Sequence, residues 1–226
     1  IVFGDWSSDV CSSDLDGVAP AGLEGVDAIA LYQSLSQCLQ EAVVRVGRGQ
    51  SLTLGPAATA VAAAAEALEA SPARLLETAS YEQFDPLALG HSVRVCLLVL
   101  QTLIAGKVDR RLLCRAGMAA LFHDIGMVQV PQEILASDRP LTEDERRIME
   151  QHPAAGAAIL AAAEGADPLA VAAAFGHHRS ADGASGYPEV RTGDPPGTMA
   201  RLVRICDVYE ALTAPRPYKK KVMPPR

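Results

Sequence analysis

Residues 121–126 read LFHDIG, which places an imidazole, His123, directly before a carboxylate, Asp124. This pair follows a stretch of helical pattern, because Asp109 can cap a helix whose apolar positions recur as far as Ala120. Neutral imidazole and carboxylate are ligand types that borderline divalent metals such as iron and manganese accept. An isolated His-Asp pair is weak evidence, so the rest of the chain decides whether this one points to a metal site.

Helical patterns also surround this stretch. Thr142 and Glu145 can form a capping box at the start of a helix, and Pro153, directly after His152, should break or restart that helix. Gly and Pro concentrate between residues 183 and 197, which predicts a loop, and no segment alternates like a strand. We therefore predict an all-α fold, with further helices over residues 31–42, 57–70, 88–105 and 199–213 and one that starts at Ser71-Pro72.

The overall composition limits the classes of function. With 226 residues, of which 49% are apolar, the chain can bury one ordinary core, so a single dominant domain is expected. A net charge of −7 argues against binding to long nucleic acid, which requires clustered Lys and Arg. The five cysteines show no CxxC spacing, which favours reduced thiols and a cytoplasmic protein. No apolar run reaches the length of about 18 residues that spans a membrane, so no membrane contact is expected.

The order of histidines and acidic residues along the chain carries more information than any one of them. A single histidine on a helix is more often a core or surface group than a ligand. Two metal ions about 3.5 to 4 Å apart, held by a bridging carboxylate, would activate hydroxide and neutralise phosphoryl charge, which is phosphodiester chemistry. In chain order the series is His91, His123-Asp124-Ile125-Gly126, His152-Pro153, Gly156, His177-His178, Asp182-Gly183, Gly186-Tyr187-Pro188, Asp207 and Arg216-Pro217-Tyr218-Lys219.

This ordered series resembles the HD-GYP family over roughly residues 28 to 221. The resemblance implies an HD-type helical bundle around a binuclear metal site, with two divalent metal ions, iron or manganese, as cofactors. It also implies a phosphodiesterase that hydrolyses cyclic di-GMP to pGpG or GMP. The metal ligands that it implies are His91, His123, Asp124, His152, His177, His178 and Asp207.

The family's pattern also implies separate roles for these residues. Asp124 would bridge the two metals and act with His123 in catalysis, and the metals would be bound by His91, His123 and Asp207 on one side and by His152, His177 and His178 on the other. Arg216 and Lys219 resemble the family's phosphate clamp, and Tyr187 belongs to its GYP loop. The alternative interpretations are a solvated basic tail for Arg216 and Lys219 and a plain turn residue for Tyr187.

Three positions depart from the family's pattern. Met127 stands where a lysine is usual, which removes a cation close to the scissile phosphate. Leu87 stands where some members place a glutamate that supports a third metal, so two metals are expected. The loop between Gly183 and Gly186 is one residue longer than usual.

The same resemblance suggests how the chain is divided. Residues 1–15 resemble a translated sequencing adapter and are interpreted as an artefact or a disordered leader, and residues 16–27 as a linker. Residues 28–226 form the expected HD-GYP domain, with N-terminal helices over 28–80 and a catalytic core over 81–221. The basic stretch at residues 219–221 follows a motif that normally leads into further helix, so we expect a domain that is truncated at its C-terminus.

Three functional hypotheses follow from the sequence. The first is a cyclic di-GMP phosphodiesterase with a cytoplasmic location. The second is a weak or inactive HD-GYP module that serves as a cyclic di-GMP receptor or protein-interaction domain, which Met127 and the longer loop favour. The third is an HD phosphohydrolase for another nucleotide, which the GYP motif disfavours. Cyclic di-GMP is the expected partner, and a second copy of the chain or a sensor or receiver domain of a longer parent protein are further expected partners.

Overall fold

The computed structural model describes residues 28–71, 89–190 and 194–213, and each regular element in these ranges is a helix. The predicted all-α fold is therefore confirmed, and an isolated bridge between Arg179 and Gly186 is the sole strand-like pairing of the described residues. The helices are α1 (Ala28–Gly47), α2 (Gly55–Ala70), α4 (Leu89–Ala105), α5 (Arg110–Leu121), the 3-10 helix η1 (Ile125–Gln129), α6 (Gln132–Leu135), α7 (Glu143–Met149), α8 (His152–Ala161), α9 (Pro168–Gly176) and α10 (Thr198–Thr213).

The predicted helix starts are found where the capping residues place them. The Asp109 side chain accepts a hydrogen bond from the Leu112 backbone N–H at 3.1 Å, and Thr142 forms the expected capping box with Glu145. Helix α7 ends before His152, and α8 begins there with Pro153 in its first turn, as predicted. The helix predicted after Ser71 lies outside the described residues. Helix α9 was not among the predicted elements, because its sequence is apolar on every side and shows no helical period.

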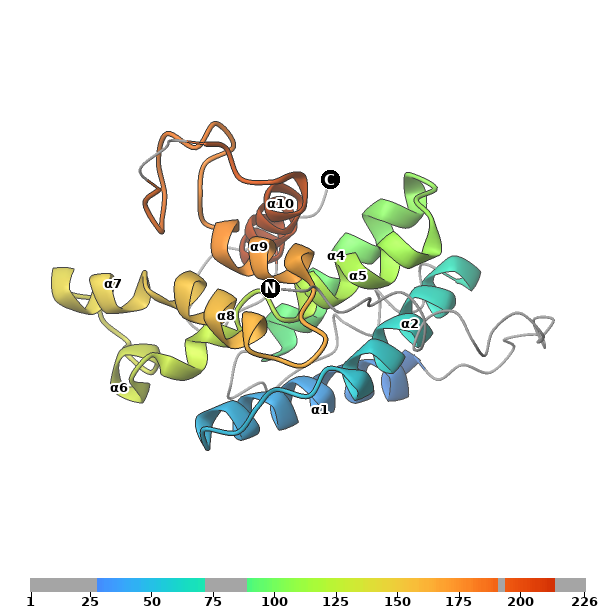
Figure 1. Cartoon of the computed structure of the whole chain (residues 1–226), viewed down its shortest axis with the longest axis horizontal. Coiled ribbons are helices and arrows are strands. Elements are labelled where there is room, and N and C mark those ends of the chain that lie inside the picture. Colours follow the sequence, from blue (N-terminus) through green and yellow to red (C-terminus); the bar gives the residue numbers. More distant parts are fainter. Residues whose placement is uncertain (1–27, 72–88, 191–193, 214–226) are drawn as a thin grey trace.

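Helices α4 and α5 form a hairpin at the centre of the bundle (Figure 1). Helices α1 and α2 pack against this hairpin on one side, while α9 contacts α5 and α10 contacts α4 on the other. One hydrophobic cluster joins these elements through fully buried side chains such as Leu35, Val61, Leu97 and Leu113. The polar residues of the sequence series come from the start of α4, the start of α8, the turns after α5 and α9, and the body of α10.

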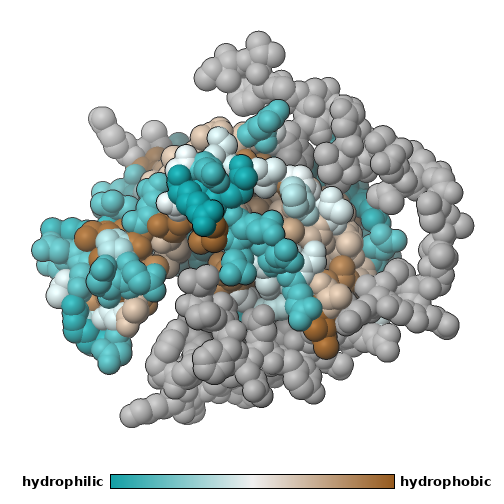
Figure 2. All heavy atoms as spheres, turned by 90° about the horizontal axis from the view of Figure 1, so that it is seen from below, coloured by the Kyte–Doolittle hydropathy of each residue, from teal (hydrophilic) through white to brown (hydrophobic). Residues whose placement is uncertain are grey.

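Helices α6 and α7 project from one end of the bundle (Figure 1). Helix α7 buries none of its residues, and the space-filling view shows mainly hydrophilic side chains around a smaller apolar patch at this end (Figure 2). Among the described residues, none of the helices combines the length and apolar character needed to cross a membrane. The described cysteines, Cys38, Cys96, Cys114 and Cys206, are all free thiols.

A partly buried ion pair fixes the start of α9, which leads to two of the predicted ligands. Asp167 is 7% exposed, accepts from the Leu169 backbone N–H at 2.9 Å, and accepts two hydrogen bonds from Arg115 of α5 at 2.7 and 2.9 Å. We expect Asp167→Ala to lower the free energy of unfolding by about 2 kcal/mol, because it removes the helix cap and leaves Arg115 unpaired. Urea denaturation measures this loss. Asp167→Asn keeps the capping oxygen and should lose less; an alanine variant as stable as the native protein would contradict the prediction.

Candidate metal centre

The structure brings the seven predicted ligands together from helices α4, α8 and α10 and from the turns that follow α5 and α9. Their ligand atoms fall into two groups, and within each group all atoms lie within 4.8 Å of one another. One group holds Asp124, His152, His177 and His178, and the other holds His91, His123 and Asp207. The resemblance implies the same division of the histidines and Asp207, with Asp124 between the two sets.

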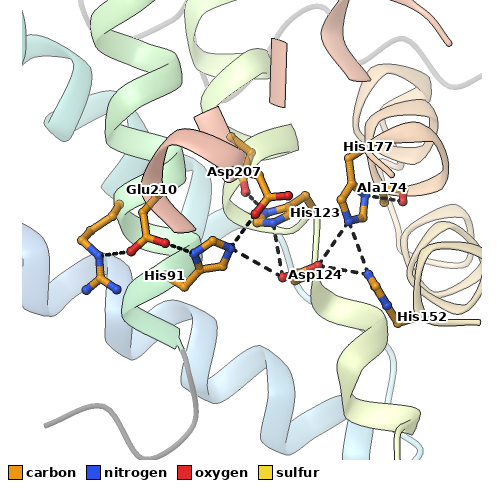
Figure 3. A network of polar contacts seen from close by, with 10 residues as sticks. His91, His123, Asp124, His152, Ala174, His177, Asp207 and Glu210 are labelled. Carbon is orange, nitrogen blue, oxygen red and sulfur yellow. Dashed lines mark hydrogen bonds and ion pairs between the residues drawn. The ribbon is translucent and has the colours of Figure 1, made fainter. Parts of the chain in front are cut away.

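Asp124 lies between the two groups and directs one carboxylate oxygen toward each (Figure 3). Its Oδ1 lies 3.3 Å from Nε2 of both His152 and His177. Its Oδ2 lies 3.3 Å from His123 Nε2 and 3.9 Å from His91 Nε2. A carboxylate in this position can bridge two cations, because each oxygen faces a separate set of nitrogen donors.

Three of the histidines are held in one orientation by the helix that precedes them. Nδ1 of His123, His152 and His177 lies 2.8 Å from a backbone carbonyl three residues earlier, in the last turn of α5, α7 and α9 respectively. A carbonyl only accepts, so each Nδ1 carries the proton and each Nε2 lone pair is left to face the centre. The carbonyls are available because helix ends lack the regular backbone partner. For the Met149 carbonyl at the end of α7, the regular partner would be the backbone N–H of residue 153, and this residue is Pro153, which has no N–H.

The buried polar atoms of the centre fit a metal ion. His123 Nε2 and Asp124 Oδ1 are buried and have no hydrogen-bond partner among the described residues. The Nε2 atoms of His152 and His177 face one another at 3.4 Å, although each is left without a proton by its Nδ1 bond. Leaving such acceptors unpaired in a protein interior is costly, and a cation is the group that converging lone pairs satisfy.

The charges of the centre are strongly coupled. Burial alone would raise the pKa of Asp124, but the surrounding His123, His152 and His177 outweigh it and hold this pKa well below the usual range. Burial lowers the pKa of His178 to about 3, with help from the charges of His177 and His152, so this imidazole is neutral and able to bind a metal at physiological pH. For His91, hydrogen bonds to Asp207 and Glu210 outweigh burial and raise the pKa to about 9. A metal ion that binds His91 Nε2 must therefore release a proton.

Close backbone packing sets the distance between Asp124 and His152. A Cβ atom at Gly126 would lie 2.0 Å from the His152 carbonyl oxygen and 2.5 Å from the Gly156 backbone nitrogen. Only glycine permits this approach of η1 to the first turn of α8. Sequence reasoning included Gly126 and Gly156 in the motif, but not the contact between them, which joins residues 30 positions apart in the chain.

Two further charged residues at the centre were not predicted as site residues. Glu210 of α10 contacts Nδ1 of His91, and Arg94 of α4 donates to Glu210 Oε1 at 2.6 Å. Burial alone would raise the pKa of Glu210, but His91 and Arg94 lower it to about 2. The sequence feature that could have identified Glu210 is its position one helical turn after Asp207, because residues three apart lie on the same face of a helix.

Of the residues predicted to bind substrate, Tyr187 lies within the described part of the chain. The Tyr187 ring is stacked on His178, with 4.6 Å between ring centroids and 27° between the planes, so it borders the centre. Burial and the nearby Asp124 raise the pKa of Tyr187 to about 12, which keeps its hydroxyl protonated. Arg216 and Lys219 lie outside the described residues, as do residues 1–15 and 16–27. Leu87 lies outside them too.

A family model described as "HD domain" matches residues 68–225, which is more than two thirds of the chain. The chain belongs to the HD-domain family. Its similarity to bacterial cyclic di-GMP phosphodiesterases agrees with the resemblance of its motifs to the HD-GYP group of that family. The expected HD-type fold is thereby confirmed, whereas the assignment of individual metal ligands stays a prediction.

Several bacterial phosphodiesterases are similar in sequence. A cyclic di-GMP phosphodiesterase of Pseudomonas aeruginosa is 32% identical over 208 residues, which cover 90% of this chain and 50% of the relative. A cyclic di-GMP phosphodiesterase response regulator of Xanthomonas campestris is 38% identical over 104 residues, or 46% of this chain and 27% of the relative. A 3'3'-cGAMP-specific phosphodiesterase of Vibrio cholerae is 37% identical over 138 residues, or 60% of this chain and 29% of the relative. The chain therefore spans half of these curated relatives or less.

The HD-type helical fold also agrees with a solved structure. An HDG"Y"P protein of Bdellovibrio bacteriovorus superposes with a TM-score of 0.68 over 84% of this chain and 62% of that chain. The two sequences are 18% identical, so this similarity describes the fold alone.

Proposed function

We propose that this HD-GYP chain is a metal-dependent phosphodiesterase that hydrolyses cyclic di-GMP to pGpG or GMP. The observation that carries the proposal is Asp124, whose two oxygens face two separate groups of histidines. We further propose two bound metal ions, iron or manganese, because imidazole and carboxylate suit these metals. Such ions would supply an activated water and neutralise charge on the phosphoryl group.

The chain's own residues would prepare the centre for this chemistry. The backbone carbonyls behind His123, His152 and His177 fix each ring so that Nε2 points inward, which reduces the reorganisation needed on binding. The low pKa of Asp124 keeps its carboxylate ionised, so both oxygens stay available. The protonated Tyr187 hydroxyl, beside His178, can donate a hydrogen bond to a phosphate oxygen but cannot repel it by charge.

The deciding experiment offers the purified, iron- or manganese-loaded chain cyclic di-GMP and, in a parallel reaction, 3'3'-cGAMP. Separation of the nucleotides shows which substrate is consumed and whether pGpG or GMP accumulates. We expect faster hydrolysis of cyclic di-GMP, in line with the name of the relative that aligns over 90% of the chain. Preferential hydrolysis of 3'3'-cGAMP would show that this nucleotide, and not cyclic di-GMP, is the substrate. If the metal-loaded protein hydrolyses neither nucleotide, the proposal is contradicted.

A lysine at position 127 is expected to raise the activity. Met127 is half-buried in η1, three residues after Asp124, where the family usually has a lysine. A charge-assisted hydrogen bond to a phosphate oxygen is worth roughly 1.5 to 3 kcal/mol, so Met127→Lys should raise kcat/KM by about one to two orders of magnitude. Met127→Leu, which keeps the packing and adds no charge, is the control. A folded, metal-loaded lysine variant without a gain would show that the missing lysine does not limit this enzyme.

Met127 and the longer loop before Gly186 favour one alternative, a receptor that binds cyclic di-GMP and hydrolyses it slowly or not at all. Equilibrium binding separates this function from catalysis. Tight binding of cyclic di-GMP with no product after long incubation would support the receptor. Turnover that depends on added metal would support the enzyme.

We also propose a cytoplasmic location, since the described cysteines are free thiols. A second copy of the chain and a sensor or receiver domain remain predicted partners. Sedimentation of the purified chain tests self-association.

A further inference from the structure

A buried carboxylate outside the predicted ligand set reaches the centre from α10. Glu210 is 3% exposed and lies one helical turn after Asp207. His91 of α4 lies against both: its Nδ1 contacts Glu210 Oε2, and its Nε2 lies 3.0 Å from Asp207 Oδ1 (Figure 3). Two carboxylates of one helix therefore hold both nitrogens of one imidazole.

Arg94 holds Glu210 from the other side. It lies one turn after His91 on α4, and its Nε donates to Glu210 Oε1 at 2.6 Å. Each carboxylate oxygen of Glu210 thus has a cationic or donor partner, which offsets the cost of burying its charge. The chain of contacts Arg94–Glu210–His91 ties α4 to α10 beside the centre.

The partner of its Nδ1 atom distinguishes His91 from three of the other predicted ligands. His123, His152 and His177 each place Nδ1 against a backbone carbonyl. Nδ1 of His91 instead faces the carboxylate of Glu210. An ionised carboxylate is a stronger acceptor than a carbonyl, and it makes the opposite ring nitrogen a more basic ligand.

We propose that Glu210, held in place by Arg94, is a positioning residue that keeps the proton of His91 on Nδ1 and presents Nε2 to the metal of the group His91, His123 and Asp207. Glu210 itself binds no metal, because both of its oxygens are engaged by His91 and Arg94. The proposal rests on the proposed binuclear centre and adds a residue that controls the affinity of one of its two sites.

Manganese titrations of the metal-free chain test this role, since two dissociation constants can be compared between variants. In Glu210→Gln the side chain keeps its shape, but its neutral amide can donate to Nδ1 as well as accept from it. We expect binding at one site to weaken by about 10- to 100-fold and binding at the other to stay unchanged. Asp167→Asn is the matched control, because Asp167 is also a buried carboxylate paired with an arginine but contacts no histidine. It should bind manganese as the native chain does.

Arg94→Met supplies a second variant that leaves Glu210 in place and removes its outer partner. It should weaken the same site by a smaller factor than Glu210→Gln, and it keeps the test decisive if Glu210→Gln does not fold. Unchanged dissociation constants in both variants, or equal weakening of both sites, would overturn the positioning role. A native chain that binds no manganese would instead overturn the proposed binuclear centre itself.

Discussion

Asp124→Asn is expected to abolish measurable hydrolysis and to lower the bound metal. Asp124 places its two carboxylate oxygens against histidines of both groups, and an amide can offer only its single oxygen as a metal ligand. Several kcal/mol of charge stabilisation depend on the metals, so turnover should fall on the order of a thousandfold or more. Elemental analysis of the purified variant gives the metal content, and separation of nucleotides gives the turnover.

Two further variants distinguish loss of the metal centre from a general effect of removing a charge. His123→Ala removes a donor to the same centre and should also lower both metal content and turnover. Asp144→Asn changes a carboxylate on α7 that is almost fully exposed, and it should leave both quantities unchanged. An Asp124→Asn variant with full metal content and native turnover would refute the proposed site.

The second large effect concerns the fold around the centre. Gly126→Ala would place a Cβ atom 2.0 Å from the His152 carbonyl oxygen and 2.5 Å from the Gly156 nitrogen, and neither backbone atom can move without shifting α8. We expect the free energy of unfolding to fall by about 3 kcal/mol or more, because overpacking against backbone cannot be relieved by a rotamer change. Bound metal should fall with it, since α8 begins with His152.

Two glycine variants calibrate this loss. Gly197→Ala adds a methyl group where no atom lies within 4 Å, so its stability should match that of the native chain. Gly117→Ala meets the ends of the Val61 and Leu100 side chains, which can adjust, and it should fall between the other two. Thermal denaturation ranks the three variants. A Gly126→Ala variant as stable as Gly197→Ala would show that η1 and α8 are not packed as closely as described.

The sequence was sufficient for the helical class, for most helix starts and for the set of candidate ligands. Caps such as Asp109 and Thr142 act over three residues, so local chemistry specifies them without the rest of the fold. The ordered series around His123-Asp124 was recognisable because its members have fixed types and order along the chain. Helix α9 escaped prediction, since its sequence is apolar on every side and therefore carries no periodic signal.

Tertiary structure alone decided how these residues act together. Which oxygen of Asp124 faces which histidine depends on the close approach of η1 and α8, and nothing local encodes the distance between segments 30 residues apart. The pairing of Glu210 with His91 joins positions 119 residues apart in the chain, on helices α10 and α4. Sequence specifies which groups are present, whereas packing of the helices determines their distances, and coupling between charges depends on distance and burial. The ligand types, and through the family resemblance their expected division between two metals, could therefore be inferred from the sequence, while the distances between them and the contact of Glu210 with His91 came from the folded bundle.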